Sequence, residues 1–186
     1  MRGSMKHTAG LSIALAAMWI VSACASLEPR AKEDLSEGYA LLHELVSKEK
    51  QVSQLSLVKT ISPELKSLLE RISETSTVTA KELDTLARVD PPLNVKATHL
   101  PKLERVARES IDNEMTKQML RSTGVDLEFN MVSSQLAAMN YAVHLARSLA
   151  VLETNPRRKE FLRQTDRKFS DLHGQVYKML FTRYQR

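Results

Sequence analysis

The stretch VDLEFNMVSSQLAAMNYAVHLARSLAVLE, residues 125–153, decides how this chain folds. Its apolar residues recur every three or four positions, the spacing that lines one face of an α-helix. The first row is Phe129, Val132, Leu136, Met139, Val143, Ala146 and Ala150, and a row on the opposite side is Met131, Ala138, Leu145, Leu149 and Leu152. A helix that is apolar on two sides has neighbours on both. We therefore predict a central helix here.

Four further helices are predicted around this one from apolar spacing and from helix-breaking residues. Ser62-Pro63 separates the first from the second, and Asn155-Pro156 opens the last. Asp90-Pro91-Pro92 and Ser122-Thr123-Gly124 mark the other breaks. The expected ranges are about 35–61, 63–89, 100–122 and 156–184. No stretch alternates as a strand does, so we predict an all-α domain over residues 35–186, a bundle of four long helices plus an extra helical segment.

The N-terminal residues are expected to lie outside this domain. Lys6 and His7 precede an apolar run that is shorter than the ~20 residues of a bilayer-spanning helix, which favours a secretion signal. The run ends in Val21-Ser22-Ala23-Cys24, which resembles the lipobox of bacterial lipoprotein precursors. We predict a signal peptide over residues 1–23, of which 1–4 are extraneous, then a lipidated Cys24 and a polar tether over 24–34. The alternative is an ordinary signal peptide or an uncleaved anchor.

Lipidation at Cys24 implies a bacterial envelope protein that is attached to the membrane through its acyl chains. Many lipoproteins with Asp directly after the cysteine stay at the inner membrane, and Ala25 occupies that position here. We therefore expect the periplasmic face of the outer membrane, or the cell membrane in a host that lacks an outer one. Cys24 is the only cysteine, so no disulfide can form within the chain.

Basic residues are concentrated at the C-terminal end, where residues 157–186 hold nine Lys and Arg against three acids. This balance suits contact with anionic lipid or another polyanion, although a solvated helix face has the same composition. The candidate contacts are Arg157, Arg158, Lys159, Arg163, Arg167 and Lys168. We expect no nucleic-acid partner, because aromatic residues do not interleave with the basic ones and the compartment is wrong.

No motif for a catalytic nucleophile or a phosphate loop is present, and no histidines pair at the spacing of metal ligands on one helix face. Two carboxylates are weak candidates for a metal site. Glu49 falls on the apolar stripe of the first helix, and Glu128 flanks the central stripe near Gln135, with Arg147 as a candidate counter-ion. Inward carboxylates hold dimetal centres in some bundles, whereas the plainer interpretation is interfacial residues with polar partners. We expect no cofactor and no enzymatic activity.

A further set of residues, between Glu49 and Val176, follows the pattern of a known family. It comprises Glu49, Gln54-Leu55, Lys59, Ser62 to Lys66, Leu83, Leu86-Ala87, Leu127-Glu128, Val132, Gln135-Leu136, Val143, Asn155-Pro156, Lys159, Phe161 and Thr165. With it the chain resembles a ferritin-like bacterial family described as outer membrane proteins, a helical domain of unknown function often found on exported proteins. The resemblance implies a ferritin-like four-helix bundle. The family usually has histidines where this chain has Ser76, Met139 and Leu172, and these side chains do not replace imidazoles as ligands.

These observations lead us to expect a lipid-anchored helical bundle with a non-enzymatic interaction or structural role in the cell envelope. Its partner would be an envelope protein or anionic lipid, and its oligomeric state is left open. Two alternatives are a degenerate ferritin-like metal-binding or redox protein that uses Glu49 and Glu128, and a carrier that holds a small ligand in the bundle core. A large apolar cavity in the core would favour the carrier, and a tightly packed core would exclude it.

Overall fold

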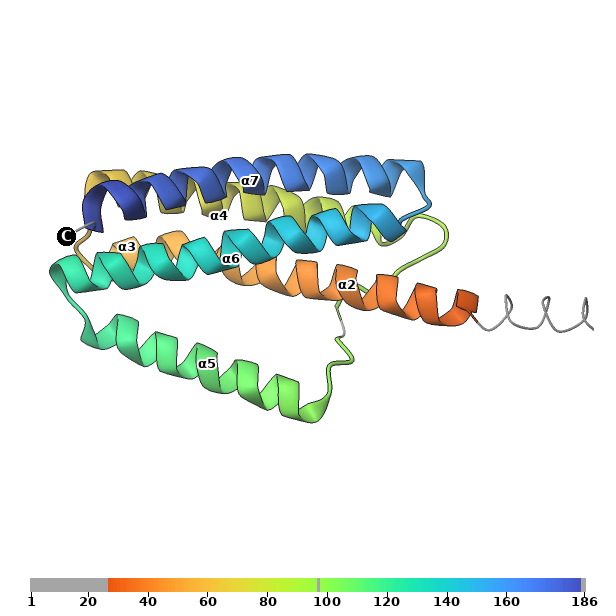
Figure 1. Ribbon diagram of the computed structural model, residues 1–186, viewed down its shortest axis with the longest axis horizontal. Coiled ribbons are helices and arrows are strands. Elements are labelled where there is room, and N and C mark those ends of the chain that lie inside the picture. The colour runs from red at the N-terminus through yellow and green to blue at the C-terminus, as the bar shows by residue number, and fades with distance from the viewer. Residues whose placement is uncertain (1–26, 97, 185–186) are drawn as a thin grey trace, which may run out of the picture. The chain divides into compact units, whose positions relative to one another are not determined.

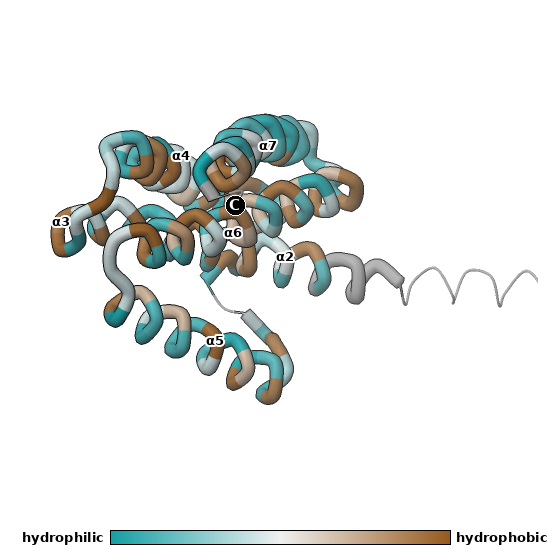
Figure 2. The backbone as a smooth tube through the Cα atoms, turned by 60° about the vertical axis from the view of Figure 1, so that its left-hand side comes forward, coloured by the Kyte–Doolittle hydropathy of each residue, from teal (hydrophilic) through white to brown (hydrophobic). Residues whose placement is uncertain are grey.

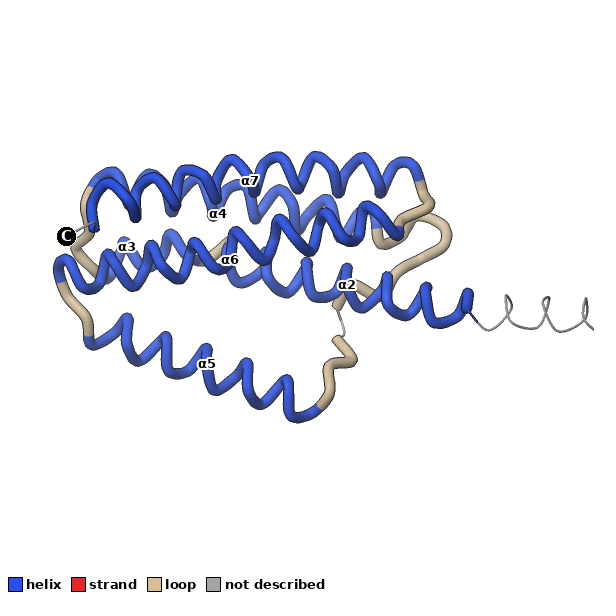
Figure 3. The backbone as a smooth tube through the Cα atoms, viewed as in Figure 1, coloured by secondary structure: helices blue, strands red, loops and turns tan. Residues whose placement is uncertain are grey.

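The computed structural model describes residues 27–96 and 98–184, and within these ranges the chain is helical and contains no strand (Figure 1, Figure 3). The predicted all-α class is therefore confirmed. The long helices are α2 (Leu27–Glu49), α4 (Pro63–Leu86), α5 (Lys102–Arg121), α6 (Gly124–Leu152) and α7 (Pro156–Tyr184). A 3₁₀ turn, η1 (Val52–Gln54), and a short helix, α3 (Leu55–Val58), lie between α2 and α4.

Helix α2 begins at Leu27, so the segment predicted as a polar tether is helical over its later residues. Pro29 lies in the first turn, where a missing N–H costs no intrahelical hydrogen bond. The predicted signal peptide over 1–23 and the predicted lipid site at Cys24 lie outside the described residues. In the described part of the chain, no helix combines the length and the hydropathy needed to cross a membrane.

Residues 35–186 form one compact unit whose hydrophobic core is shared by α2, α4, α6 and α7. Burying a large aliphatic side chain contributes about 1.5–3 kcal/mol, so this core is the main source of stability. Its fully buried members include Leu42 and Val46 of α2, Leu65, Leu69 and Ile72 of α4, Val132 and Met139 of α6, and Leu162, Phe169 and Val176 of α7.

Helix α6 occupies the central position that its two apolar rows predict. Residues of both rows are buried, among them Met131, Val132 and Leu149, and α6 contacts both α5 and α7. The exceptions lie toward its ends, where Phe129 and Leu152 are exposed. The turn into α7 follows from the sequence too, because the Asn155 side-chain oxygen accepts hydrogen bonds from the backbone N–H groups of Arg157 (3.0 Å) and Arg158 (3.2 Å).

The first predicted helix is interrupted, which corrects the expected range of 35–61. Helix α2 ends at Glu49, and η1 and α3 follow it. The hydroxyl of Ser73 on α4 donates to the Lys50 carbonyl at 2.5 Å and accepts a hydrogen bond from Ser53 at 3.1 Å. A side chain of another helix therefore satisfies a carbonyl released at the end of α2. This contact also explains a polar residue in the middle of α4, where the apolar pattern is weak.

Gly38 marks a close approach between α2 and α6. A Cβ atom at this position would lie 2.6 Å from Cδ2 of Leu149, closer than two carbon atoms can pack. Glycine normally weakens a helix interior by about 1 kcal/mol relative to alanine. An alanine here would require the Leu149 side chain to shift, so the glycine lets α2 and α6 pack closely with this rotamer of Leu149.

Helix α5 differs from the other long helices because none of its residues is buried. The sequence predicts an inner face that includes Leu103, Val106 and Ile111, but these side chains are 84%, 50% and 58% exposed. Hydrophobic and hydrophilic residues alternate along α5 in Figure 2. The apolar spacing correctly indicates a helix but wrongly indicates a core element, because the core is already filled by the other four helices.

Candidate functional site

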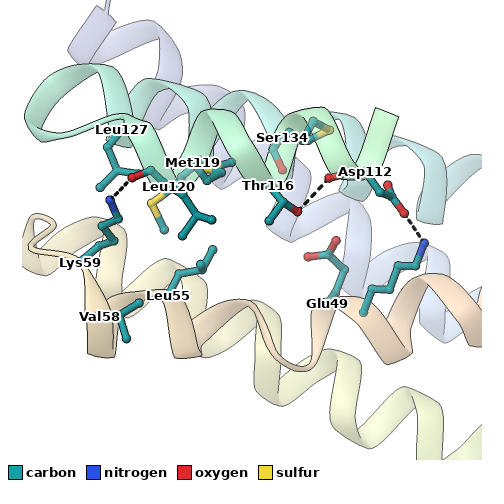
Figure 4. A pocket seen from close by; sticks show the side chains of 13 residues that line it. Glu49, Leu55, Val58, Lys59, Asp112, Thr116, Met119, Leu120, Leu127 and Ser134 are labelled. Carbon is teal, nitrogen blue, oxygen red and sulfur yellow. Dashed lines mark hydrogen bonds and ion pairs between the residues drawn. The ribbon is translucent and has the colours of Figure 1, made fainter. Parts of the chain in front are cut away.

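An open groove runs between α5 on one side and α2, α3 and α6 on the other (Figure 4). One half has a volume of about 340 Å³ and the other about 250 Å³, and Glu49, Lys48, Asp112, Met115 and Ser134 line both. The volume of the larger half is near the lower end of the range for small-molecule sites. Its apolar lining is Leu55, Val58, Met115, Met119, Leu120, Leu127 and Met131.

Polar contacts hold α5 over this groove. Lys48 of α2 pairs with Asp112 of α5 at 2.7 Å. At the C-terminal end of α5, the Lys59 ammonium donates to the carbonyls of Leu120 (2.7 Å) and Ser122 (3.3 Å). A cation at a helix C-terminus is favourable because the free carbonyls give that end a partial negative charge. The helix is thus supported at points along its length, and the space between these points stays open.

The Glu49 carboxylate points into the groove from the last turn of α2 (Figure 4). Burial raises the pKa of Glu49 to about 6, and the Gln135 amide and the Lys48 ammonium only partly oppose that rise. Its Oε2 atom is buried and accepts no hydrogen bond from the described residues. The inward position that the stripe predicts for Glu49 is therefore found, together with an incompletely satisfied carboxylate.

Glu128, the second predicted carboxylate, belongs to a different cluster. It accepts hydrogen bonds from the backbone N–H of Ser62 (2.5 Å) and the Ser62 hydroxyl (3.1 Å), and it pairs with Arg183 at 2.8 Å. Arg183 also pairs with Glu64 at 3.0 Å. These contacts join the start of α4, the start of α6 and the end of α7. The predicted counter-ion Arg147 instead pairs with Asp166 at 2.9 Å on α7, because it lies farther along α6.

Glu49 and Glu128 therefore have separate partners. Within residues 27–96 and 98–184, no three His, Cys, Asp or Glu side chains gather closely enough to hold a metal ion. The positions at which the resemblance implies histidines, Ser76, Met139 and Leu172, are buried in the core. Serine, methionine and leucine side chains do not replace imidazole as ligands for a hard or borderline metal ion.

A fully buried ionic network lies away from the groove, and the sequence pattern does not predict it. Glu153 accepts hydrogen bonds from Tyr39 (2.7 Å), from Arg158 (2.8 Å) and from the backbone N–H of Asn155 (2.7 Å). Arg158 also donates to the carbonyls of Val89 (3.2 Å) and Pro91 (2.8 Å). Burial would raise the pKa of Glu153, but these hydrogen bonds outweigh it and lower the pKa below its usual range. Burial, followed by the nearby Glu153 carboxylate, raises the pKa of Tyr39.

The network corrects one predicted surface contact, because Arg158 is 1% exposed and engaged by Glu153. Its charge is compensated inside the protein and cannot touch a surface partner. Lys159 is half-buried, and Arg167 pairs with Glu160 at 3.2 Å. Of the remaining predicted basic contacts, Arg157, Arg163 and Lys168 are exposed on α7, as is Arg167.

Comparisons of the chain with family models, with curated proteins and with solved structures each found no match. The apolar spacing of residues 100–122 predicts that Met115 and Met119 lie on an inner face, whereas both are half-buried and line the groove. No sequence signal separates a helix that fills a core from one that stands beside it, since both have an apolar stripe.

Proposed function

We propose that this protein is a lipid-anchored, non-enzymatic binding protein of the bacterial envelope, with the groove between α5 and the bundle as its binding surface. The proposal rests on the apolar groove, whose larger half has a volume of about 340 Å³. The groove lies beneath α5, a helix in which no residue is buried. A pocket of this size that is mostly apolar and has a few polar groups is the usual form of a small-ligand site. A groove beside the filled core, rather than a cavity within it, is therefore the basis for favouring a ligand-binding role over a purely structural one.

The anchoring part of the proposal rests on the lipobox-like Val21 to Cys24 and on the apolar run before it. Attachment through Cys24 would hold the bundle at the periplasmic face of the outer membrane. Metabolic labelling with a radioactive fatty acid should label the wild-type protein and not Cys24→Ala, which should also accumulate as an uncleaved precursor. Unchanged membrane association and processing in that variant would show that the protein is not a lipoprotein.

We also propose that α2, α4, α6 and α7 form a ferritin-like bundle, with α5 as the extra segment. Support comes from the one core that these four helices share and from the position of α5 in the chain, between α4 and α6. An experimental structure whose four core helices superimpose, in order, on a ferritin-like bundle would support this proposal. A different spatial order of the helices would contradict it.

Binding in the groove can be tested with an apolar dye that fluoresces when it leaves water, such as N-phenyl-1-naphthylamine. Ser134 lines both halves of the groove, so Ser134→Trp should fill it and abolish dye binding. The matched control is Ser67→Trp, on an exposed position of α4, which should bind dye as the wild type does. Equal dye binding by both variants would show that the groove is not the binding surface.

A further inference from the structure

The groove combines a long apolar lining with a single incompletely satisfied charged group. Glu49 lies where the two halves of the groove meet, and its Oε2 atom is buried without a hydrogen-bond donor among the described residues. A buried ionised carboxylate is costly unless a cation or several donors face it. The Gln135 amide is neutral and supplies only part of that stabilisation. A ligand that brought a positive charge to Oε2 would supply the rest.

The cations that line the groove are engaged elsewhere. Lys48 directs its ammonium to Asp112 at 2.7 Å and to Glu44 at 3.1 Å. Arg108 pairs with Glu104 at 2.8 Å and lies over the Tyr141 ring. Lys59, at the far end of the larger half, donates to the Leu120 carbonyl (Figure 4) and also to the Ser122 carbonyl at the end of α5. None of these contacts is with Glu49.

We infer that the groove binds a small amphipathic amine, with its ammonium group on the Glu49 carboxylate and its apolar chain along Leu55, Met119 and Met131. This inference rests on the proposed function, in which the groove is the binding surface. Charge complementarity selects the head group, because an anionic head would meet a like charge in a poorly solvated site. In the larger half of the groove, apolar side chains line the space from the Glu49 side chain to the Lys59 side chain, and this lining favours an apolar tail on the ligand.

Three ligands of ten carbons each test the head group: decylamine, decanol and decanoate, each below its solubility limit and its critical micelle concentration. Calorimetry at pH 8 would use residues 24–186, expressed without the predicted signal peptide and with Cys24→Ser, so that neither an acyl chain nor detergent competes for the groove. Decylamine should bind at least about tenfold more tightly than decanol, the effect of one hydrogen bond to a charged group, and decanoate should bind least. Glu49→Gln should remove the preference for the amine and leave decanol binding unchanged.

Glu74→Gln is the matched control, because Glu74 is an exposed carboxylate on α4 and does not line the groove. It should keep the preference for the amine. In the wild type the preference should fade as the pH falls through about 6, where Glu49 becomes protonated, and Glu49→Gln should lack this change.

The outcomes separate the two proposals. If decanol binds but decylamine binds no better, or if Glu49→Gln keeps the preference, the amine inference is wrong and the groove remains a binding surface. If none of the three ligands binds, the proposed function fails and the amine inference fails with it.

Discussion

Two buried carboxylates of this protein have opposite surroundings. Glu153 receives hydrogen bonds from Tyr39, Arg158 and a backbone N–H, and its pKa is lowered. Glu49 lies in the groove with one oxygen unsatisfied, and its pKa is raised to about 6. The comparison shows that burial alone does not define the role of a charged residue. A carboxylate whose oxygens are both engaged stabilises the fold, whereas Glu49 keeps one oxygen that a donor from a ligand can reach.

The two groups also make stability depend on pH in opposite directions. A carboxyl group with a lowered pKa stabilises the protein above its unfolded pKa, and that contribution is lost as the pH falls through the folded pKa. The Glu153 network therefore weakens in acid. A carboxyl group with a raised pKa, such as Glu49, is tolerated best when protonated, so its cost to stability grows as the pH rises from about 4.5 to about 6.

The largest expected effect comes from removing the cation of the satisfied network. Arg158→Met should lower the free energy of unfolding by about 3–5 kcal/mol, because it leaves Glu153 buried without its counter-charge. Urea unfolding followed by circular dichroism at pH 7 measures this change. Arg157→Met, at the adjacent exposed position, should change stability by less than about 0.5 kcal/mol. Equal effects of the two substitutions would mean that the network does not stabilise the fold.

Tyr39→Phe removes one donor from the same network and keeps the aromatic ring. Loss of a hydrogen bond to a charged group should cost about 1.5–3 kcal/mol. The control is Tyr177→Phe, whose ring is partly exposed and stacks on Phe181. Thermal unfolding of both variants gives the comparison, and a Tyr39→Phe variant as stable as the control would argue against a strong Tyr39–Glu153 interaction.

The groove carboxylate should behave in the opposite way. Glu49→Gln should raise the free energy of unfolding by about 2 kcal/mol at pH 8, the cost of the pKa rise to about 6, and should change little at pH 4. Urea titrations at both pH values measure the difference. A variant that is destabilised at pH 8 would show that the Glu49 carboxylate is already well satisfied, and the contrast with Glu153 would disappear.

The smallest effect on stability is expected from the exposed basic residues of α7. The triple substitution Arg157→Glu, Arg163→Glu, Lys168→Glu should leave stability within about 1 kcal/mol, because these side chains are exposed. If α7 contacts anionic lipid, the same variant should bind vesicles of anionic lipid less well at low salt, where such attraction is strongest. If the wild-type protein does not bind such vesicles, these residues form a solvated helix face and not a lipid-contact surface.

Much of the fold could be predicted because its signals are local. The starts of α4 and α7 at Pro63 and Pro156 follow from a proline that can open a helix but not continue one. The apolar rows of α6 predict its central position. The inward position of Glu49 also follows from helical spacing. Of the two candidate metal-binding carboxylates, Glu49 therefore does face inward, although it lies in the groove and not beside Glu128.

The remaining features depend on contacts between residues far apart in the chain. The end of α2 depends on Ser73 of α4, and the burial of Arg158 depends on Tyr39 and on the carbonyls of Val89 and Pro91. A sequence pattern contains no distance between such residues. For the same reason it assigns Glu128 to Arg147, whereas the assembled helices bring it to Arg183.

By itself the sequence determined the helical class, the position of most helix breaks and the identity of the central helix, because side-chain spacing and proline geometry act within a few residues. Only the tertiary structure decided that α5 stands beside a filled core, that a groove lies under it, and that one buried carboxylate is satisfied while another is not. These outcomes depend on which surfaces meet. The number of partners around a charged group is a property of the assembled helices and not of any one of them.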